Sequence, residues 1–379
     1  MTAPSEKHTE DANTLFRTTP LEMVRRKGNS LLLSPSDWVT VSEHSPEPDA
    51  NHVRGMTPSG LSPQPNPHVW SQNNELPQID GLFELRECIG HGGFGDVYKA
   101  FDLVLRRDVA IKTLRTENEK FSMRYRFITE ANVAAYLEHP NIIPVHGLYT
   151  DEQNQLHRVE KLIKGDDFKA IIESQIEDYN KKSRREIAKE EREHLITRLE
   201  IFLKVCDAID YAHDKNILHN DIKLENIMVG EFSEVYVTDW GLAETRDSET
   251  RRREKKQVGT LLYMPPEIFG NGIYDSRSDI YSLGVMLFYI LFLVPPFPNV
   301  VSQQGLIELK AKGLVSPQEH LFGVKIPRPL HSIVRKAIAT QPANRYQTVA
   351  KLAGDIRLFL RGKPVTPTFC QKIEKWFTF

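Results

Sequence analysis

One short stretch, residues 219–226, constrains this chain more than any other. It reads His-Asn-Asp-Ile-Lys-Leu-Glu-Asn. Two short runs of β-type residues separated by a turn follow it, and the tripeptide Asp-Trp-Gly comes next, at 239–241. This pattern predicts a tight hairpin. A chain that forms this hairpin must bring four polar side chains together at its base. They are those of Asp221, Lys223, Asn226 and Asp239.

These polar groups suit the transfer of a phosphoryl group from ATP to a hydroxyl. The transferred group carries spread negative charge, so a protein must mainly position and neutralise it. Asp221 would accept the proton of the attacking hydroxyl, and Lys223 would neutralise charge on the moving phosphate. Mg²⁺ prefers hard oxygen ligands, few of them from protein. Asn226 and Asp239 would supply such ligands from opposite sides of the hairpin.

The stretch resembles the catalytic loop of protein kinases, His-Arg-Asp-Leu-x-x-x-x-Asn, and Asp-Trp-Gly resembles their Asp-Phe-Gly. A glycine-rich loop lies upstream, at residues 90–97. Glycine triplets alone are a weak signal, because dinucleotide-binding turns and plain tight turns also contain them. Here a second strand pattern follows instead of a helix, which favours a hairpin lid over phosphates. The resemblance implies ATP contacts from Gly90, Gly92, Gly93 and Gly95.

Lys112 and Glu130 are the next charged pair that the resemblance singles out. Lys112 ends a Val-Ala-Ile-Lys strand pattern, 17 residues after Gly95. A lone Lys in a strand, or a Glu on an amphipathic helix, is usually a solvated surface residue. In protein kinases this Lys holds the α- and β-phosphates and pairs with a Glu of the following helix. The apolar periodicity predicts that helix over residues 121–138.

Three further motifs extend the resemblance over roughly residues 80–360. Residues 259–267 resemble the end of the activation segment, with Pro-Pro-Glu for Ala-Pro-Glu, and Arg345 resembles the late Arg that pairs with this Glu. The apolar run 280–294 is too short to cross about 30 Å of hydrocarbon, which favours a buried central helix. The whole set is most similar to bacterial kinases of the eukaryotic-like (Hanks) serine/threonine type, and Lys223 agrees with that class.

The resemblance implies an α+β fold with two lobes. Residues 79–164 would form the small lobe, a five-stranded antiparallel sheet with one helix. Residues 165–362 would form a larger helical lobe, and ATP and Mg²⁺ would bind in the cleft. Residues 1–78 are rich in proline and polar residues and sparse in large apolar ones, which predicts a disordered tail. Residues 363–379 form a C-terminal tail.

The strand before Gly165 carries a departure from the usual kinase pattern. It places Glu160 where kinases have an apolar gatekeeper behind adenine, and an ionised carboxylate there is costly to bury. Glu160 would pair with Lys112 or another cation, face solvent through a shift of register, or be protonated. On this alignment the adenine and ribose contacts come from Lys161, Ile163, Asp167, Val97, Ala110 and Met228.

A second departure is Asn220, where most kinases have an Arg that binds the phosphorylated activation loop. Asn has no charge and cannot pair bidentately with phosphate. The sequence therefore predicts a kinase of the non-RD type, in which activation-loop phosphorylation is not strictly required. The basic run 251–256 in the same segment is either a solvated loop or an attraction for acidic substrates.

Three functions are compatible with these motifs. The first is an active serine/threonine protein kinase that uses ATP and Mg²⁺ on protein substrates, its own chain among the candidates. The second is a pseudokinase scaffold, which only Asn220 and Glu160 support. The third is a small-molecule phosphotransferase, which residues 239–267 disfavour because they form a peptide-docking platform in kinases.

The net charge and the cysteine content limit which partners and which cellular compartment we expect for this chain. The net charge of -2 gives no electrostatic reason for nucleic acid or an anionic membrane as the main partner. The three cysteines lack metal or redox spacing, and the polar start lacks an apolar signal core. These features predict a reducing, cytoplasmic location.

Overall fold

The computed structural model describes residues 76–91, 95–115, 121–245, 260–269, 275–297, 303–313, 317 and 319–365. The predicted tails 1–78 and 363–379 fall almost entirely outside the described residues. Gly92, Gly93 and the basic run 251–256 also lie outside them.

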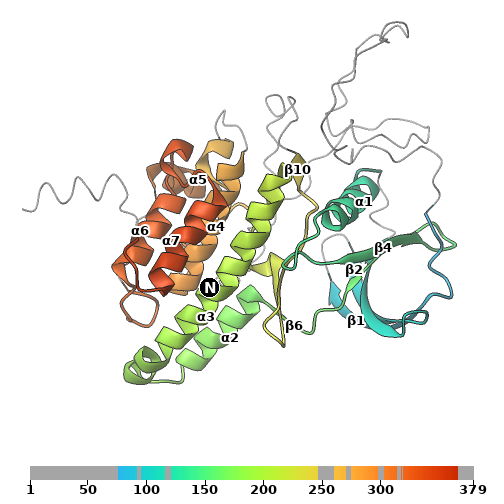
Figure 1. Ribbon diagram of the computed structural model, residues 1–379, viewed down its shortest axis with the longest axis horizontal. Helices are drawn as coiled ribbons and strands as arrows, with labels where there is room; N and C mark the ends of the chain where they lie inside the picture. Colours follow the sequence, from blue (N-terminus) through green and yellow to red (C-terminus); the bar gives the residue numbers. More distant parts are fainter. Residues whose placement is uncertain are drawn as a thin grey trace, which may run out of the picture.

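The first part of the chain forms an antiparallel sheet of five strands in the order β1-β2-β3-β5-β4, with helix α1 beside it (Figure 1). Branched side chains of Val109, Ile111 and Val159 pack as one small core of this sheet. Leu114, Phe127 and Leu156 form another, which joins α1 to β3 and β5. The elements are β1 (Phe83–His91), β2 (Gly95–Asp102), β3 (Arg107–Leu114), α1 (Phe121–Tyr136), β4 (Val145–Thr150) and β5 (Leu156–Lys161).

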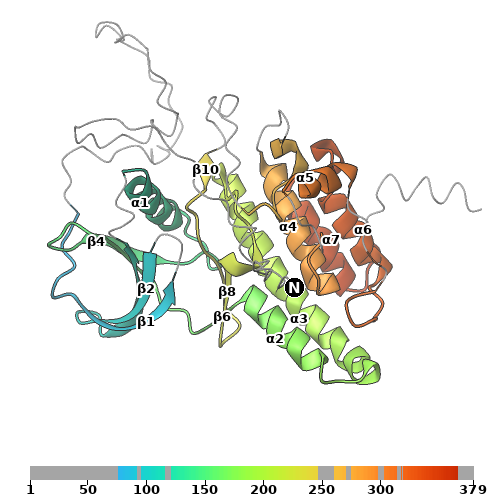
Figure 2. The same cartoon turned by 180° about the vertical axis from the view of Figure 1, so that it is seen from behind.

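The second part of the chain is mostly helical and lies to one side of the sheet (Figure 2). Its core is one large apolar cluster centred on α4 (Ser276–Phe292), which is buried along nearly its whole length. The apolar run 280–294 is therefore a buried central helix, as predicted. The other helices are α2 (Phe168–Tyr179), α3 (Arg184–Asp214), α5 (Gln303–Lys312), α6 (Arg328–Ala337) and α7 (Val349–Leu360).

Short strands lie between the two parts. The predicted hairpin is confirmed as β8 (Ile227–Gly230) and β9 (Val235–Val237), and β6 (Gly165–Asp167) pairs with its first strand. β7 (Ile217–Leu218) pairs with β10 (Glu244–Thr245), so the chain entering and the chain leaving the hairpin region lie side by side. Short 3-10 helices are η3 (Leu224–Asn226), η5 (Pro266–Phe269) and η6 (Pro342–Asn344).

The two-lobed α+β arrangement that the sequence predicted is confirmed. The predicted late ion pair is also present, because Arg345 donates to both oxygens of Glu267 at 2.7 and 2.6 Å. Among the described residues, no helix combines the length and apolarity that a membrane crossing requires.

The packing of α4 against α6 depends on a glycine. A Cβ at Gly284 would lie 2.7 Å from both Ala337 Cβ and Ile338 Cγ2. We expect Gly284→Ala to lower the free energy of unfolding by about 1–3 kcal/mol through overpacking. Gly354→Ala in α7, where a Cβ meets nothing within 4 Å, should raise it by about 0.5–1 kcal/mol. Urea denaturation of both variants measures their free energies of unfolding. Equal changes in the two variants would contradict the role of Gly284 in packing.

Candidate active site

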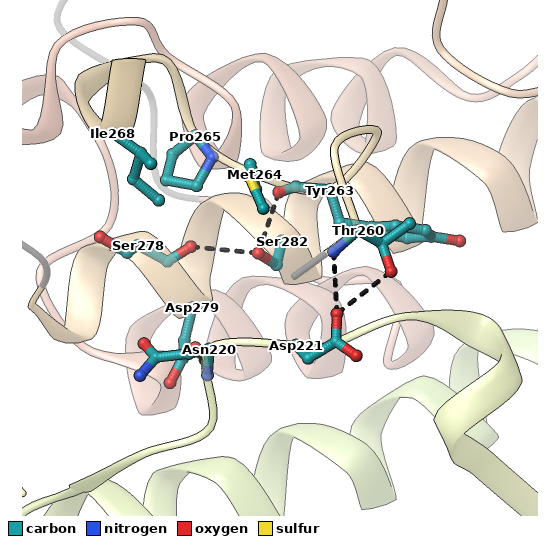
Figure 3. A pocket seen from close by; sticks show the side chains of 10 residues that line it. All are labelled: Asn220, Asp221, Thr260, Tyr263, Met264, Pro265, Ile268, Ser278, Asp279 and Ser282. Atoms are coloured by element: carbon teal, nitrogen blue, oxygen red, sulfur yellow. Dashed lines mark hydrogen bonds between the residues drawn. The ribbon is translucent and has the colours of Figure 1, made fainter. Parts of the chain in front are cut away.

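The loop between β7 and β8 places Lys223 and Asn226 beside the carboxylate of Asp221. Figure 3 shows this carboxylate with Thr260 and Asp279 near it. Lys223 Nζ donates to Asp221 Oδ2 at 2.8 Å, and Asn226 Nδ2 donates to the Asp221 carbonyl at 2.9 Å. From a distant segment, Thr260 donates its N–H and its hydroxyl to Asp221 Oδ1 at 3.0 and 3.1 Å. Both carboxylate oxygens therefore have a donor that fixes their direction.

Asp279 of α4 anchors this loop through hydrogen bonds to its backbone. Its buried carboxylate accepts the backbone N–H groups of His219 at 2.9 Å and Asn220 at 3.0 Å. It also pairs with His213 Nε2 at 2.8 Å. Asn220 has a φ of 64°, a left-handed conformation that Asn and Asp adopt more readily than other non-glycine residues. The local sequence and the buried anchor therefore favour the same sharp turn before Asp221.

The two candidate carboxylates differ in their electrostatic surroundings. Burial acts to raise the pKa of Asp221, but the Lys223 ammonium outweighs it and holds this pKa below its ordinary value. Burial, and then the negative charge of Glu130, raise the pKa of Asp239, with Lys112 opposing them. Asp221 thus stays ionised, while Asp239 is a half-buried carboxylate whose ionised form a nearby positive charge would stabilise.

A chain of four buried or half-buried charges crosses the small lobe. Lys112 Nζ lies 3.1 Å from Glu130 Oε1, as the motifs predicted. Arg158 Nη1 lies 2.8 Å from the same Glu130 oxygen, and Arg158 Nε donates to Glu160 Oε2 at 2.8 Å. The sequence left three outcomes open for Glu160, and the structure shows the first, pairing with a cation. The Glu160 carboxylate is buried, and its partner is Arg158 and not Lys112.

Burial acts to raise the pKa of Glu130, but the charges of Arg158 and Lys112 outweigh it and lower this pKa to about 2. Burial by itself would lower the pKa of Arg158, yet Glu130 and Glu160 raise it above its ordinary value. Each charge in the chain is thus compensated by its neighbours.

The residues expected around a nucleotide come from the small-lobe strands, the link after β5, and strands β6 and β8. Ala110 of β3 is opposite Glu160 of β5 in the sheet register. Gly95 begins β2, where a Cβ would come within 2.1 Å of the Thr113 carbonyl, so only glycine fits. The Asp167 carboxylate caps α2 by accepting the Ala170 N–H at 2.9 Å. The remaining described candidates are Gly90 in β1, Val97 in β2, Lys161 in β5, Ile163 in the link to β6, and Met228 in β8.

Trp240 is fully buried, and its ring lies 4.5 Å from that of His219. An indole N–H that is buried usually has an acceptor, but no described residue accepts from Trp240 Nε1. The nearby Asn220 Nδ2 donates to the Leu242 carbonyl at 3.0 Å, which ties this segment to the loop.

Two functional candidates have no counterpart in the sequence analysis. Arg158 is one of them. The other is Lys310 of α5, a buried lysine whose Nζ donates to the carbonyls of Leu261, Leu262 and Met264 at 2.7, 2.9 and 2.5 Å. Lys310 therefore fastens the segment that also carries Thr260. The sequence carries a signal for Arg158, because a strand with opposite charges at Arg158 and Glu160 places both side chains on one face. It carries none for Lys310, because its partners are backbone carbonyls.

The comparison with known protein families decides the assignment. The protein kinase domain matches residues 83–353. The chain belongs to the protein kinase family. This kinase domain is 31% identical over 315 residues to the serine/threonine-protein kinase PknD of Protochlamydia amoebophila, across 77% of this chain and 32% of that protein. It is 34% identical over 301 residues to PknD of Chlamydia pneumoniae, across 74% of this chain and 31% of that protein.

The resemblance to bacterial serine/threonine protein kinases that the motifs predicted is confirmed by these matches. The chain spans about a third of the length of these curated relatives.

The buried Lys310 makes the stability of the kinase domain depend on pH. Burial lowers the pKa of Lys310 to about 7, with Glu267 opposing. In the unfolded chain a lysine has a pKa of about 10.4, so between these values the unfolded state binds more protons. Relative to Lys310→Met, the wild-type free energy of unfolding should therefore rise with pH above about 7, by at most about 1.4 kcal/mol per pH unit.

Urea denaturation of both proteins from about pH 6.5 to about pH 9 measures this difference. A constant difference over that range would contradict a low pKa of Lys310.

Proposed function

We propose that this chain is an active serine/threonine protein kinase that transfers the γ-phosphoryl group of ATP to Ser or Thr hydroxyls of protein substrates. The observation that carries the proposal is the ionised Asp221 carboxylate, held by Lys223 and Thr260. Lys112 and Glu130 form an ion pair at 3.1 Å on the other lobe. A base, a neutralising cation and a phosphate-binding lysine are the groups that this reaction needs.

Each of these residues has a distinct proposed role. Asp221 orients the substrate hydroxyl and accepts its proton, and Lys223 neutralises charge that develops on the transferred group. Lys112 holds the α- and β-phosphates, and Glu130 keeps its ammonium directed toward the cleft. Thr260 keeps Asp221 and Lys223 aligned, since its hydroxyl lies 3.1 Å from Asp221 Oδ1 and 3.3 Å from Lys223 Nζ.

Asn226 and Asp239 would hold Mg²⁺. Asn226 is buried and Asp239 is half-buried. Both offer the hard oxygen ligands that this ion prefers, and the raised pKa of Asp239 fits a carboxylate made to face a cation. When bound, the ion neutralises phosphate charge. Asn226 is held in place by its own donation to the Asp221 carbonyl at 2.9 Å.

The nucleotide itself would lie against the strands of the small lobe. The Lys161 carbonyl and the Ile163 N–H would bind adenine, with Val97, Ala110 and Met228 around the ring. The oxygen of Asp167 that does not cap α2 would bind the ribose. Gly90 and Gly95, with Gly92 and Gly93 between them in the sequence, would cover the phosphates through their backbone.

We further propose that the kinase is of the non-RD type. Asn220 carries no charge, and its side chain donates to the Leu242 carbonyl, so it offers no site for a phosphorylated loop. The pseudokinase alternative has less support. Glu160, one of its two arguments, is neutralised by Arg158 at 2.8 Å and so leaves no unpaired charge behind adenine.

Replacing Asp221 tests the proposed activity. We expect Asp221→Asn, which keeps the shape but not the base, to lower the turnover number about 10²- to 10⁴-fold while Mg-ATP still binds. The assay incubates each protein with Mg-ATP and a basic carrier protein and locates phosphate on Ser or Thr by mass spectrometry. Asp207→Asn, at a half-exposed carboxylate paired with Arg357, is the matched control. Absence of phosphate from wild type as well would favour the scaffold.

Replacing activation-segment hydroxyls tests the proposed regulation. Ser248→Ala and Thr250→Ala should each keep kcat/KM within about tenfold of wild type, because Asn220 cannot respond to a phosphate. Thr260→Ala should lose more, since this hydroxyl contacts Asp221 and Lys223, and Thr260→Ser should recover most of the loss. A loss of more than about tenfold from Ser248→Ala or Thr250→Ala would rule out the non-RD assignment.

A further inference from the structure

The middle of strand β5 places two opposite charges on one face of the sheet. Arg158 and Glu160 are two residues apart, so their side chains leave β5 on the same side. In the register with β3, Arg158 lies opposite Lys112 and Glu160 lies opposite Ala110. Both side chains are buried, at 4% and 7% exposure. A strand interior with two desolvated charges needs a reason, because each charge alone is costly there.

Arg158 is the centre of this arrangement because it contacts two carboxylates. Its Nη1 lies 2.8 Å from Glu130 of α1, and its Nε donates to Glu160 at 2.8 Å. Its guanidinium carbon also lies 5.8 Å from the ring centroid of Phe127, one turn before Glu130. One side chain of the sheet therefore contacts α1 through a charge and through an aromatic ring.

The four charges of Lys112, Glu130, Arg158 and Glu160 sum to zero. Removing Arg158 alone would leave Glu130 and Glu160 close together with Lys112 as their only cation in the set. That repulsion would be relieved by moving α1 away from the sheet. Removing both Arg158 and Glu160 would leave the Lys112–Glu130 pair balanced. Buried pairs commonly tolerate replacement of both partners by apolar groups better than loss of one.

We propose that Arg158 is a positioning residue which, together with Glu160, locks α1 against the sheet with Glu130 facing Lys112. The Lys112–Glu130 pair is then assembled by contacts inside the small lobe and needs no phosphorylated segment. The lock also explains Glu160, since an apolar residue there would leave Arg158 with an unbalanced charge. This inference rests on the proposed kinase activity.

A double-mutant cycle tests the lock. Arg158→Met should lower kcat/KM at least about tenfold, mainly through kcat, and Arg158→Met/Glu160→Met should recover to within about threefold of wild type. Hydrogen exchange of the α1 amides is the second readout. Exchange should become faster in Arg158→Met and return toward wild type in the double variant. Arg357→Met, which removes a half-exposed arginine paired with Asp207, is the matched control and should change neither readout.

Three results would overturn the lock. Arg158→Met could keep wild-type kcat/KM and wild-type α1 exchange. The double variant could be as impaired as the single one, which would make Arg158 merely structural. Glu160→Met alone, the variant that stands in if Arg158→Met does not fold, could leave both readouts unchanged. If wild type transfers no phosphate, the proposed function fails while the exchange measurements still decide whether Arg158 holds α1.

Discussion

The carboxylate of Asp279 is the contact on which the arrangement of the site depends. It lies in the first turn of α4, the most buried of the described helices, and it accepts the backbone N–H groups of His219 and Asn220 in the loop before β8. An ionised group in that position would be unfavourable without these donors and His213. Burial acts to raise the pKa of Asp279, but hydrogen bonds and the charges of His213 and His219 outweigh it and lower this pKa. The core thus fixes the turn that presents Asp221.

Charge compensation holds the structure in the same way at two other places in the kinase domain. In the small lobe four charges balance one another across β3, α1 and β5. In the large lobe Arg345 neutralises Glu267 at the end of the activation segment. Lys310 is different, because its ammonium is solvated by backbone carbonyls and not by a carboxylate. Buried polar contacts therefore hold the segments that have no large apolar core of their own, such as the sheet of the small lobe and the end of the activation segment.

How much of this could be predicted depends on how local each relation is. The offsets within 219–226 and the hairpin after it are local, so the sequence predicted that Asp221, Lys223 and Asn226 meet. Lys112 and Glu130 lie on different elements, and only the family resemblance related them. Lys310 could not be predicted, because every carbonyl is an equivalent partner in a sequence. For Glu160, the sequence left three outcomes open, since a shift of one residue would turn its side chain to the opposite face of β5.

The paired charges of β5 also restrict how this kinase domain can change in evolution. A single substitution at Arg158 or at Glu160 passes through a chain with an uncompensated buried charge, which is strongly disfavoured. Two substitutions, or a reversal that keeps the balance, avoid that intermediate. Related chains are therefore expected to carry both charges or neither, so that these positions covary as divergence proceeds. Alignment of many homologues would reveal the pair as one inherited unit.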